Sequence, residues 1–296
     1  MPAQRLAAGR LAALVWLAGL LALAAPTLAG PSAHPLRAAS APLARAPDGR
    51  PIALTFSTDF RRFSADPRLD HVWRTAFGDT PDPGLDKRTL AGNGELEVYV
   101  DPRYGAKLGA PDLDPFSVAG GVLDITSRPA PPALLPKLEG RRYLSGLISS
   151  QPSFAQTYGY FEARARLPRG KGLWPAIWLL PADMSWPPEI DIMESIGDPL
   201  TIYCSTHSKT EPSHTTKARL SGDGFHTFAL SWGRRWMVWY VDGVEVARHP
   251  TPADMHEPMY LIANLAVGGK WPGPPDQSTV FPAKFSIAYI RAYRFT

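Results

Sequence analysis

Short apolar runs, many of them alternating with polar residues, recur along the chain from about residue 51 and are separated by glycine and proline. In residues 158–167 (YGYFEARARL), the even-numbered residues from 160 to 166 fall on one face of an extended strand, and the apolar odd-numbered residues fall on the other. Residues 236–247 (WMVWYVDGVEVA) predict a hairpin with a tight Asp242-Gly243 turn, and residues 285–295 predict a further strand. We therefore predict an all-β fold, two stacked antiparallel sheets around one large core.

The first 29 residues have the pattern of a secretory signal peptide. Arg5 and Arg10 precede an apolar run over residues 11–25, and small residues such as Ala24 and Ala29 offer cleavage positions. This run is shorter than the roughly 20 residues that span a bilayer, which favours cleavage over the alternative, an uncleaved anchor. We predict a secreted protein, periplasmic or extracellular, with no membrane association after cleavage.

The segment that follows is rich in proline and alanine. Residues 30–50 contain no aromatic side chain, which is typical of a linker or a disordered segment. The remaining residues, 51–296, have the length of one β-sandwich domain. We expect this domain to be monomeric.

Charge, cysteine and histidine usage exclude several classes of function. The formal net charge is +4, and the three pairs of adjacent arginines are far apart in sequence: Arg61-Arg62, Arg141-Arg142 and Arg234-Arg235. No basic stripe of the kind that binds nucleic acid is predicted. The single cysteine, Cys204, excludes an internal disulfide and predicts a small buried thiol. The seven histidines have no metal-ligand spacing, so we expect no metal site among them.

Three carboxylates lie close together in residues 186–197 (WPPEIDIMESIG). In a regular strand Glu189 and Asp191 share a face, and Glu194 points to the opposite one. A one-residue β-bulge near residues 192–193 would return Glu194 to the carboxylate face and leave the apolar residues behind it. The pattern therefore predicts a bulged strand with three acids on one side.

The spacing of these acids suggests glycosidase chemistry. The two Glu backbones would lie about 13 Å apart, and side chains that converge would leave a gap of roughly 5–6 Å, the separation typical of retaining glycosidases. Glu189 would then be the nucleophile, Glu194 the acid/base, and Asp191 a hydrogen-bond partner that separates their pKa values. A solvated acidic strand and a calcium site are the alternatives that the spacing alone leaves open.

The bulged motif E-x-D-x-x-E, with Glu189, Asp191 and Glu194, resembles that of the family 16 glycoside hydrolases. Other segments that look similar to the family are residues 159–168, 172–181, 225–243 and 260–271, and the resemblance covers about residues 55–296. It implies a β-jelly-roll sandwich with a concave cleft for a glycan chain. The residues Asn93-Gly94-Glu95, Pro115-Phe116 and Pro187-Pro188 look similar to exopolysaccharide-degrading members that act on succinoglycan, although laminarinases share the bulged motif.

Two positions depart from the family pattern. The C-terminal strand carries Ala288 where many members have an aspartate that serves a structural calcium site, which puts calcium in doubt and leaves no expected cofactor. In addition, Ser208 follows His207, whereas an aromatic residue often follows that histidine in the family.

Aromatic side chains can hold the apolar faces of sugars. The resemblance implies such platforms at Trp174, Trp178 and Trp271, with core packing as the alternative for each. Trp232, Trp236 and Trp239 are assigned to the core or to the outer sheet.

Four polar residues complete the predicted substrate site. His207 would bond to Asp191 or to the sugar, and Asn93 and Asn264 match polar positions near the cleft of the family. Arg164 would reach the substrate or pair with Glu162. Each of the four could instead have a structural role.

Taken together, these features predict a retaining endo-β-glycanase that hydrolyses a β-glucan or a glucose-rich bacterial exopolysaccharide with β-1,3 or β-1,4 linkages. The expected partner is a polysaccharide, not a nucleic acid. A laminarinase-type β-1,3-glucanase and a transglycosylase are alternatives within this class, because sugar can capture a covalent intermediate in place of water. A non-catalytic glycan-binding protein on the same fold is the alternative from another class.

Overall fold

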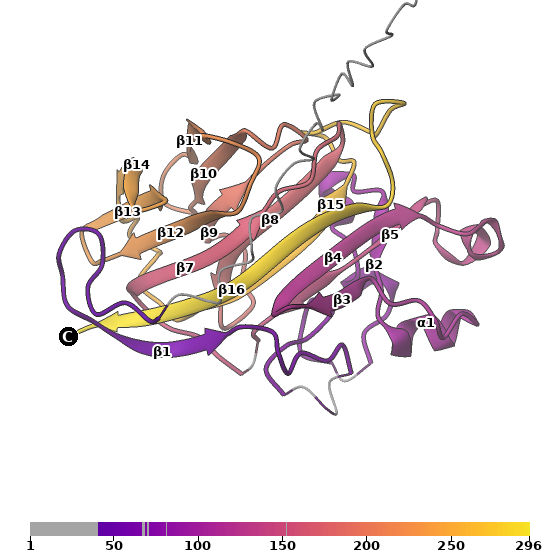
Figure 1. Ribbon diagram of the computed structural model, residues 1–296, viewed down its shortest axis with the longest axis horizontal. Helices are drawn as coiled ribbons and strands as arrows, with labels where there is room; N and C mark the ends of the chain where they lie inside the picture. Colours follow the sequence, from indigo (N-terminus) through magenta and orange to yellow (C-terminus); the bar gives the residue numbers. More distant parts are fainter. Residues whose placement is uncertain (1–40, 67–68, 70, 81, 152) are drawn as a thin grey trace, which may run out of the picture. The chain divides into compact units, whose positions relative to one another are not determined.

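The computed structural model describes residues 41–66, 69, 71–80, 82–151 and 153–296. In this part of the chain, sixteen strands form two sheets with one main core between them (Figure 1). The strands pair antiparallel throughout the described region, except that β2 and β5 pair in parallel. The predicted all-β sandwich is confirmed.

The ten-stranded sheet has the order β14-β13-β12-β7-β16-β4-β5-β2, and β1 and β3 pair with β16 and β4. Its strands are β1 (Ile52–Thr58), β2 (Glu97–Tyr99), β3 (Phe116–Ala119), β4 (Val122–Pro129), β5 (Tyr143–Ser145), β7 (Gly159–Arg166), β12 (His226–Trp232), β13 (Trp236–Val241), β14 (Val244–Pro250) and β16 (Ala283–Phe295). The long strand β16 crosses this sheet between β7 and β4 (Figure 1).

The six-stranded sheet has the order β11-β10-β9-β8-β15-β6. Its strands are β6 (Leu147–Ser149), β8 (Leu173–Pro181), β9 (Glu189–Glu194), β10 (Thr201–His207), β11 (His214–Arg219) and β15 (Met259–Val267). The helices are short and lie in the connections: α1 (Pro102–Leu108) and the 3₁₀ turns η1 (Leu85–Lys87), η2 (Ala91–Asn93) and η3 (Pro132–Lys137).

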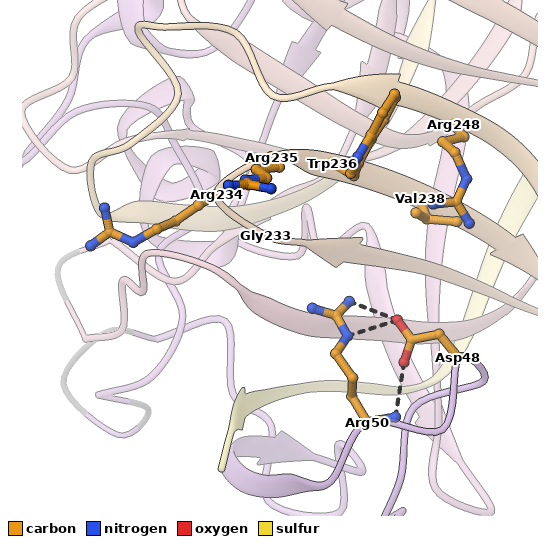
Figure 2. A pocket seen from close by; sticks show the side chains of 8 residues that line it. All are labelled: Asp48, Arg50, Gly233, Arg234, Arg235, Trp236, Val238 and Arg248. Atoms are coloured by element: carbon orange, nitrogen blue, oxygen red, sulfur yellow. Dashed lines mark hydrogen bonds and ion pairs between the residues drawn. The ribbon is translucent and has the colours of Figure 1, made fainter.

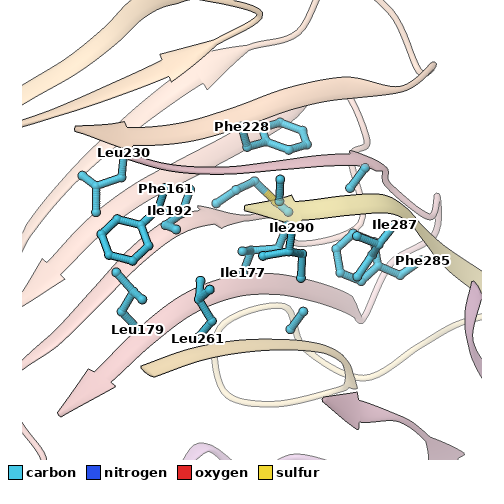
Figure 3. Packing of buried hydrophobic residues seen from close by; sticks show 14 of the residues in the cluster. Phe161, Ile177, Leu179, Ile192, Phe228, Leu230, Leu261, Phe285, Ile287 and Ile290 are labelled. Atoms are coloured by element: carbon cyan, nitrogen blue, oxygen red, sulfur yellow. The ribbon is translucent and has the colours of Figure 1, made fainter. Parts of the chain in front are cut away.

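Apolar side chains from both sheets meet in the core. Phe161 and Phe228 come from the ten-stranded sheet, and Ile177, Ile192 and Leu261 come from the six-stranded one (Figure 3). The alternation predicted for residues 158–167 is confirmed, because the odd-numbered residues from 161 to 167 belong to the main core. The alternation therefore decides which side of this strand faces the main core.

The turn between β13 and β14 follows from its two residues. Asp242 and Gly243 both have positive φ, 50° and 82°, as in a type I′ hairpin. The Asp242 carboxylate also accepts a hydrogen bond from the backbone N–H of Thr227 on β12, at 2.8 Å. The predicted hairpin is confirmed, and its turn is bonded to the neighbouring strand.

The N-terminal boundary of the domain needs a correction. Ala46 is buried, Arg45 forms a β-bridge with Pro51, and Asp48 binds Arg50. The packed chain therefore begins before residue 51, and the last part of the predicted 30–50 linker belongs to the domain. The predicted signal peptide, residues 1–29, lies outside the described residues. Within the described ranges, no helix has the length and apolar character needed to span a bilayer.

One tryptophan connects the two sheets across the core. Trp239 on β13 is fully buried, and its indole N–H donates to the backbone carbonyl of Asp191 on β9, at 2.8 Å. Trp239→Phe removes this bond and leaves a void, so we expect the free energy of unfolding to fall by about 1–3 kcal/mol. Denaturant unfolding measures the change. Trp236→Phe, at an exposed position of the same strand, is the matched control and should change stability by less than about 0.5 kcal/mol; equal losses would contradict the assignment.

Candidate active site

A β-bulge in β9 determines where the three acids point. Residues 177 and 178, adjacent on β8, pair with residues 193 and 191 of β9, so Ile192 is the extra residue. Ile192 and Met193 both pack in the core. Glu194 therefore returns to the side of Glu189 and Asp191, which we call the carboxylate face. The bulge predicted from the sequence is confirmed.

Cys204 lies opposite this bulge on β10. Its thiol is buried and lies 3.6 Å from the Ile192 carbonyl, to which it donates a weak hydrogen bond. Burial raises the pKa of the Cys204 thiol, so the group remains neutral. The prediction of a small buried thiol is confirmed.

His207 and Asp191 form the centre of the site. His207 pairs with Glu189 across β10 and β9, and its Nε2 lies 3.2 Å from Asp191 Oδ2. Its Nδ1 lies 3.0 Å from the Ser213 hydroxyl, which orients the ring. Asp191 is only 1% exposed, and burial and the neighbouring charge of Glu189 raise its pKa well above the usual range. Asp191 is therefore suited to hold a proton toward Glu189.

Glu194 has the environment of a general acid. It is 7% exposed, and its Oε1 accepts a hydrogen bond from the indole N–H of Trp174, at 2.8 Å. Burial is the main cause that raises the pKa of Glu194 well above its usual range, and the charges of Asp191 and Glu189 add to it. The bond from Trp174 opposes this shift because it stabilises the ionised form.

Three aromatic side chains, from Trp174, Trp271 and Tyr203, lie around Glu194. Trp271 is 42% exposed, and its ring meets Trp174 edge-on with 5.6 Å between centroids. Tyr203, which pairs with Glu194 in the sheet, contacts Trp271 with 4.7 Å between centroids. Asn93 lies nearby: its carbonyl accepts a bond from Lys270 N, the residue before Trp271. The roles of Trp174, Trp271, His207 and Asn93 in binding substrate stay predictions.

Two residues at the site were not identified from the sequence. The exposed Trp186, in the loop before β9, donates its indole N–H to Glu189 Oε2 at 2.6 Å. The position of Trp186, three residues before Glu189, already indicated in the sequence that its side chain could lie near this carboxylate. Tyr203 was missed because only the pairing of β10 with β9 places it beside Glu194.

Trp178 and Asn264 lie on the carboxylate face in a packed environment, and their contact with substrate stays a prediction. Trp178 is 5% exposed and meets Phe77 edge-on. Its indole N–H donates to Asn264 Oδ1 at 2.8 Å, and Asn264 Nδ2 donates to the Tyr99 hydroxyl at 2.9 Å. Residues that precede β2 cover this part of the sheet, so both side chains support the floor of the site.

This hydrogen-bond chain ends at two buried carboxyl groups. The Tyr99 hydroxyl donates to Glu95 Oε2 at 3.3 Å, and Asn93 donates to Glu95 Oε1 at 3.0 Å. Glu97 is fully buried, and its Oε2 accepts a bond from Val267 N at 2.7 Å. Burial and the charge of Glu95 raise the pKa of Glu97 well above the usual range. Glu97 is thus the protonated partner that donates to Glu95.

Arg164 does not belong to the site, which corrects the predicted substrate contact. It lies on β7 of the ten-stranded sheet, on the side opposite to core residues Phe161 and Ala163. Its guanidinium lies 5.8 Å from the centroid of the Phe225 ring. The alternative pairing with Glu162 is also absent among the described contacts, since Glu162 interacts with Arg291 and Tyr293. The core separates Arg164 from the three acids.

The same groups could in principle hold a cation. One oxygen of Glu189, one of Asp191 and a ring nitrogen of His207 all lie within 4.8 Å of one another. Two carboxylates and an imidazole suit several divalent metals. However, Trp186 already donates to Glu189, and burial favours the protonated form of Asp191. Glu189, Asp191 and His207 are therefore better suited to proton transfer than to binding a metal ion.

Comparisons with known proteins agree on one family. The model of glycosyl hydrolases family 16 matches residues 126–291. The chain is 42% identical over 247 residues to endo-1,3-1,4-beta-glycanase EglC of Rhizobium meliloti (strain 1021), covering 82% of this chain and 52% of EglC. It is 33% identical over 262 residues to a beta-glucanase of Rhodothermus marinus, covering 77% of this chain and 86% of that protein.

Solved structures show the same fold. The laminarinase structure from Rhodothermus marinus is 31% identical, with a TM-score of 0.67, and covers 83% of this chain and 99% of that one. The laminarinase catalytic domain from Thermotoga maritima is 32% identical, with a TM-score of 0.67 and the same shares. The sandwich is thus the predicted β-jelly roll. The chain spans about half the length of the Rhizobium relatives.

The buried Glu97 makes stability depend on pH. Its folded pKa lies above the unfolded value near 4.5, so the folded state binds more protons and stability falls as pH rises above about 4.5. Glu97→Gln keeps a neutral donor of similar shape. We expect the variant to lose less stability than the parent between pH 5 and pH 8, with a difference of about 1 kcal/mol or more. Urea unfolding at each pH measures it; parallel curves would contradict the assignment.

Proposed function

The chain belongs to glycosyl hydrolases family 16, and from this membership we propose that it is an exported, retaining endo-β-glycanase. The proposed substrate is a β-glucan or a glucose-rich bacterial exopolysaccharide with β-1,3 or β-1,4 linkages. The relative EglC is named for an endo-1,3-1,4-beta-glycanase activity, which supports these linkages. Export rests on the signal-like sequence of residues 1–29.

The observation that carries the proposal is the bulged β9, which puts a partly exposed Glu189 and a buried Glu194 on one face with Asp191 between them. A retaining mechanism requires one carboxylate that attacks and one carboxylic acid that donates a proton. Trp186 orients Glu189, and Trp174 orients Glu194. The two acids thus differ in environment, as the two roles demand.

In the first step, a Glu189 oxygen attacks the anomeric carbon while the glycosidic C–O bond breaks. Glu194 gives its proton to the leaving oxygen, and a glycosyl ester on Glu189 remains. In the second step, Glu194 removes a proton from water, the water oxygen bonds to the anomeric carbon, and Glu189 is released. Asp191, supported by His207, donates its hydrogen bond to Glu189 when that carboxylate leaves.

A substrate panel tests the proposed activity. Purified residues 30–296 should release new reducing ends from laminarin, mixed-linkage β-glucan or a succinoglycan-type exopolysaccharide, and Glu189→Gln should lower the rate by about 10³ or more. The first product should be the β-anomer by proton NMR, and EDTA should leave the rate unchanged. Agarose and κ-carrageenan are the controls. Hydrolysis that survives in Glu189→Gln would contradict the assignment of Glu189 as the nucleophile. Transfer products at high acceptor concentration would identify a transglycosylase.

The bond from Trp174 to Glu194 predicts a shift in the pH profile. The indole N–H stabilises ionised Glu194, so Trp174→Phe should raise the pKa of this residue. Because the acid must be protonated, the alkaline limb of kcat/KM should move to higher pH. Trp271→Phe makes the same replacement at a neighbouring indole that has no hydrogen bond to Glu194, and it serves as the control. An unmoved or acid-shifted alkaline limb in Trp174→Phe would contradict the role of Glu194 as acid.

A further inference from the structure

A groove lined by arginine lies on the outer face of the ten-stranded sheet. It is formed by the strands β13 and β14, the turn before β13 and the N-terminal segment around Asp48. Four arginines and one aspartate line it, together with Trp236 (Figure 2). The carboxylate face belongs to the other sheet, so this groove is separate from the candidate active site.

Two of the four arginines already have acidic partners. Arg50 binds Asp48 through Nε and Nη2, at 2.8 and 2.7 Å (Figure 2). Arg248 binds Glu245 through two bonds of 2.8 and 2.7 Å. These pairs hold the two guanidinium groups in place and neutralise much of their charge.

The other two arginines have no acidic partner within the described part of the chain. Arg234 lies 5.5 Å from the centroid of the Tyr158 ring, a cation–π arrangement that leaves its charge uncompensated. No carboxylate pairs with the adjacent Arg235 among the described residues. The groove therefore has an excess of positive charge: Arg235 lies beside Trp236, and the Arg234 side chain extends away from Trp236 toward one end of the groove (Figure 2).

Trp236 adds a second kind of contact. Its indole is 48% exposed, although the next outward-facing residue of the same strand, Val238, is buried. A flat exposed indole in a groove offers an apolar platform to the C–H face of a pyranose ring. Guanidinium groups bind carboxylates in forked geometry. A ligand that satisfies both is a sugar chain with carboxylate groups.

Nucleic acid fits this surface less well. The other adjacent arginine pairs are distant in sequence, and two of the four groove arginines are neutralised, so the surface offers few phosphate contacts. The indole platform together with a local positive charge favours an acidic glycan.

We propose that this groove is a second glycan-binding site, specific for carboxylate-bearing polysaccharides, with Trp236 as the sugar platform and Arg234 and Arg235 as the anion-binding groups. Because it is located on the opposite sheet, the site holds a polymer chain without occupying the active site. Two sites on one protein raise the effective concentration of an acidic polymer near the domain. The proposal does not depend on which glycan the active site cleaves.

Affinity electrophoresis tests the site in native gels that contain carboxymethylated β-1,3-glucan or the neutral polymer. The parent is Glu189→Gln, and the variants on this background are Trp236→Ala and the double variant Arg234→Gln/Arg235→Gln. Each variant should reduce the retardation by the anionic polymer at least about fivefold, the reduction expected when roughly 1 kcal/mol of binding free energy is lost. The double variant should also abolish most of the salt dependence.

The matched control is Arg61→Gln/Arg62→Gln, which removes the same charge from another exposed pair and should change retardation less than twofold. Melting temperatures exclude unfolding of the variants. Three outcomes would overturn the proposal. The control could lose as much retardation as the groove variants, the parent and the groove variants could be retarded equally, or gels that contain DNA could retard the parent as strongly as gels that contain the anionic glucan. Rates on laminarin in the Glu189-containing enzyme report on the proposed activity separately, and the groove variants should leave them unchanged.

Discussion

The orientation of the three acids depends on one β-bulge in one strand. Ile192 lets β9 turn two consecutive apolar residues into the core and still return Glu194 to the side of Glu189 and Asp191. In a regular strand without the bulge, the six residues of β9 would instead point Glu194 into the core and Met193 to the carboxylate face, at a cost of several kcal/mol. The backbone around this irregularity is bonded to both neighbours: the Cys204 thiol approaches the Ile192 carbonyl, and Trp239 donates to the Asp191 carbonyl from the other sheet.

Burial of acids is the second physical theme of the structure. Asp191, Glu194, Glu95 and Glu97 are all removed from solvent, and burial is the first cause that raises each pKa. A proton on a buried carboxyl group avoids the large desolvation cost of the ion. At the proposed active site, that proton can be transferred to a leaving group. At Glu97 it completes a hydrogen-bond chain that runs through Glu95 and Tyr99 to the residues beneath the site.

The two sheets use exposed aromatic residues in different surroundings. Beside the six-stranded sheet, the half-buried Trp174 of β8 and the exposed loop residues Trp186 and Trp271 lie around carboxyl groups, and the indoles of Trp174 and Trp186 donate hydrogen bonds to them. On the ten-stranded sheet, Trp236 lies among arginines (Figure 2). The same side chain thus faces an acidic environment on one side of the sandwich and a basic one on the other, so the two faces suit different contacts with a polysaccharide.

The sequence by itself determined the strand pattern, the hairpin at Asp242-Gly243, the bulge and the grouping of Glu189, Asp191 and Glu194. All of these are local, because the period of two along a strand specifies which residues share a side. Only the tertiary structure decided that Trp178 and Asn264 are covered, that Arg164 lies on the far sheet, and that Tyr203 reaches the site. These outcomes depend on register and layering between distant segments, which the alternation within one strand does not encode.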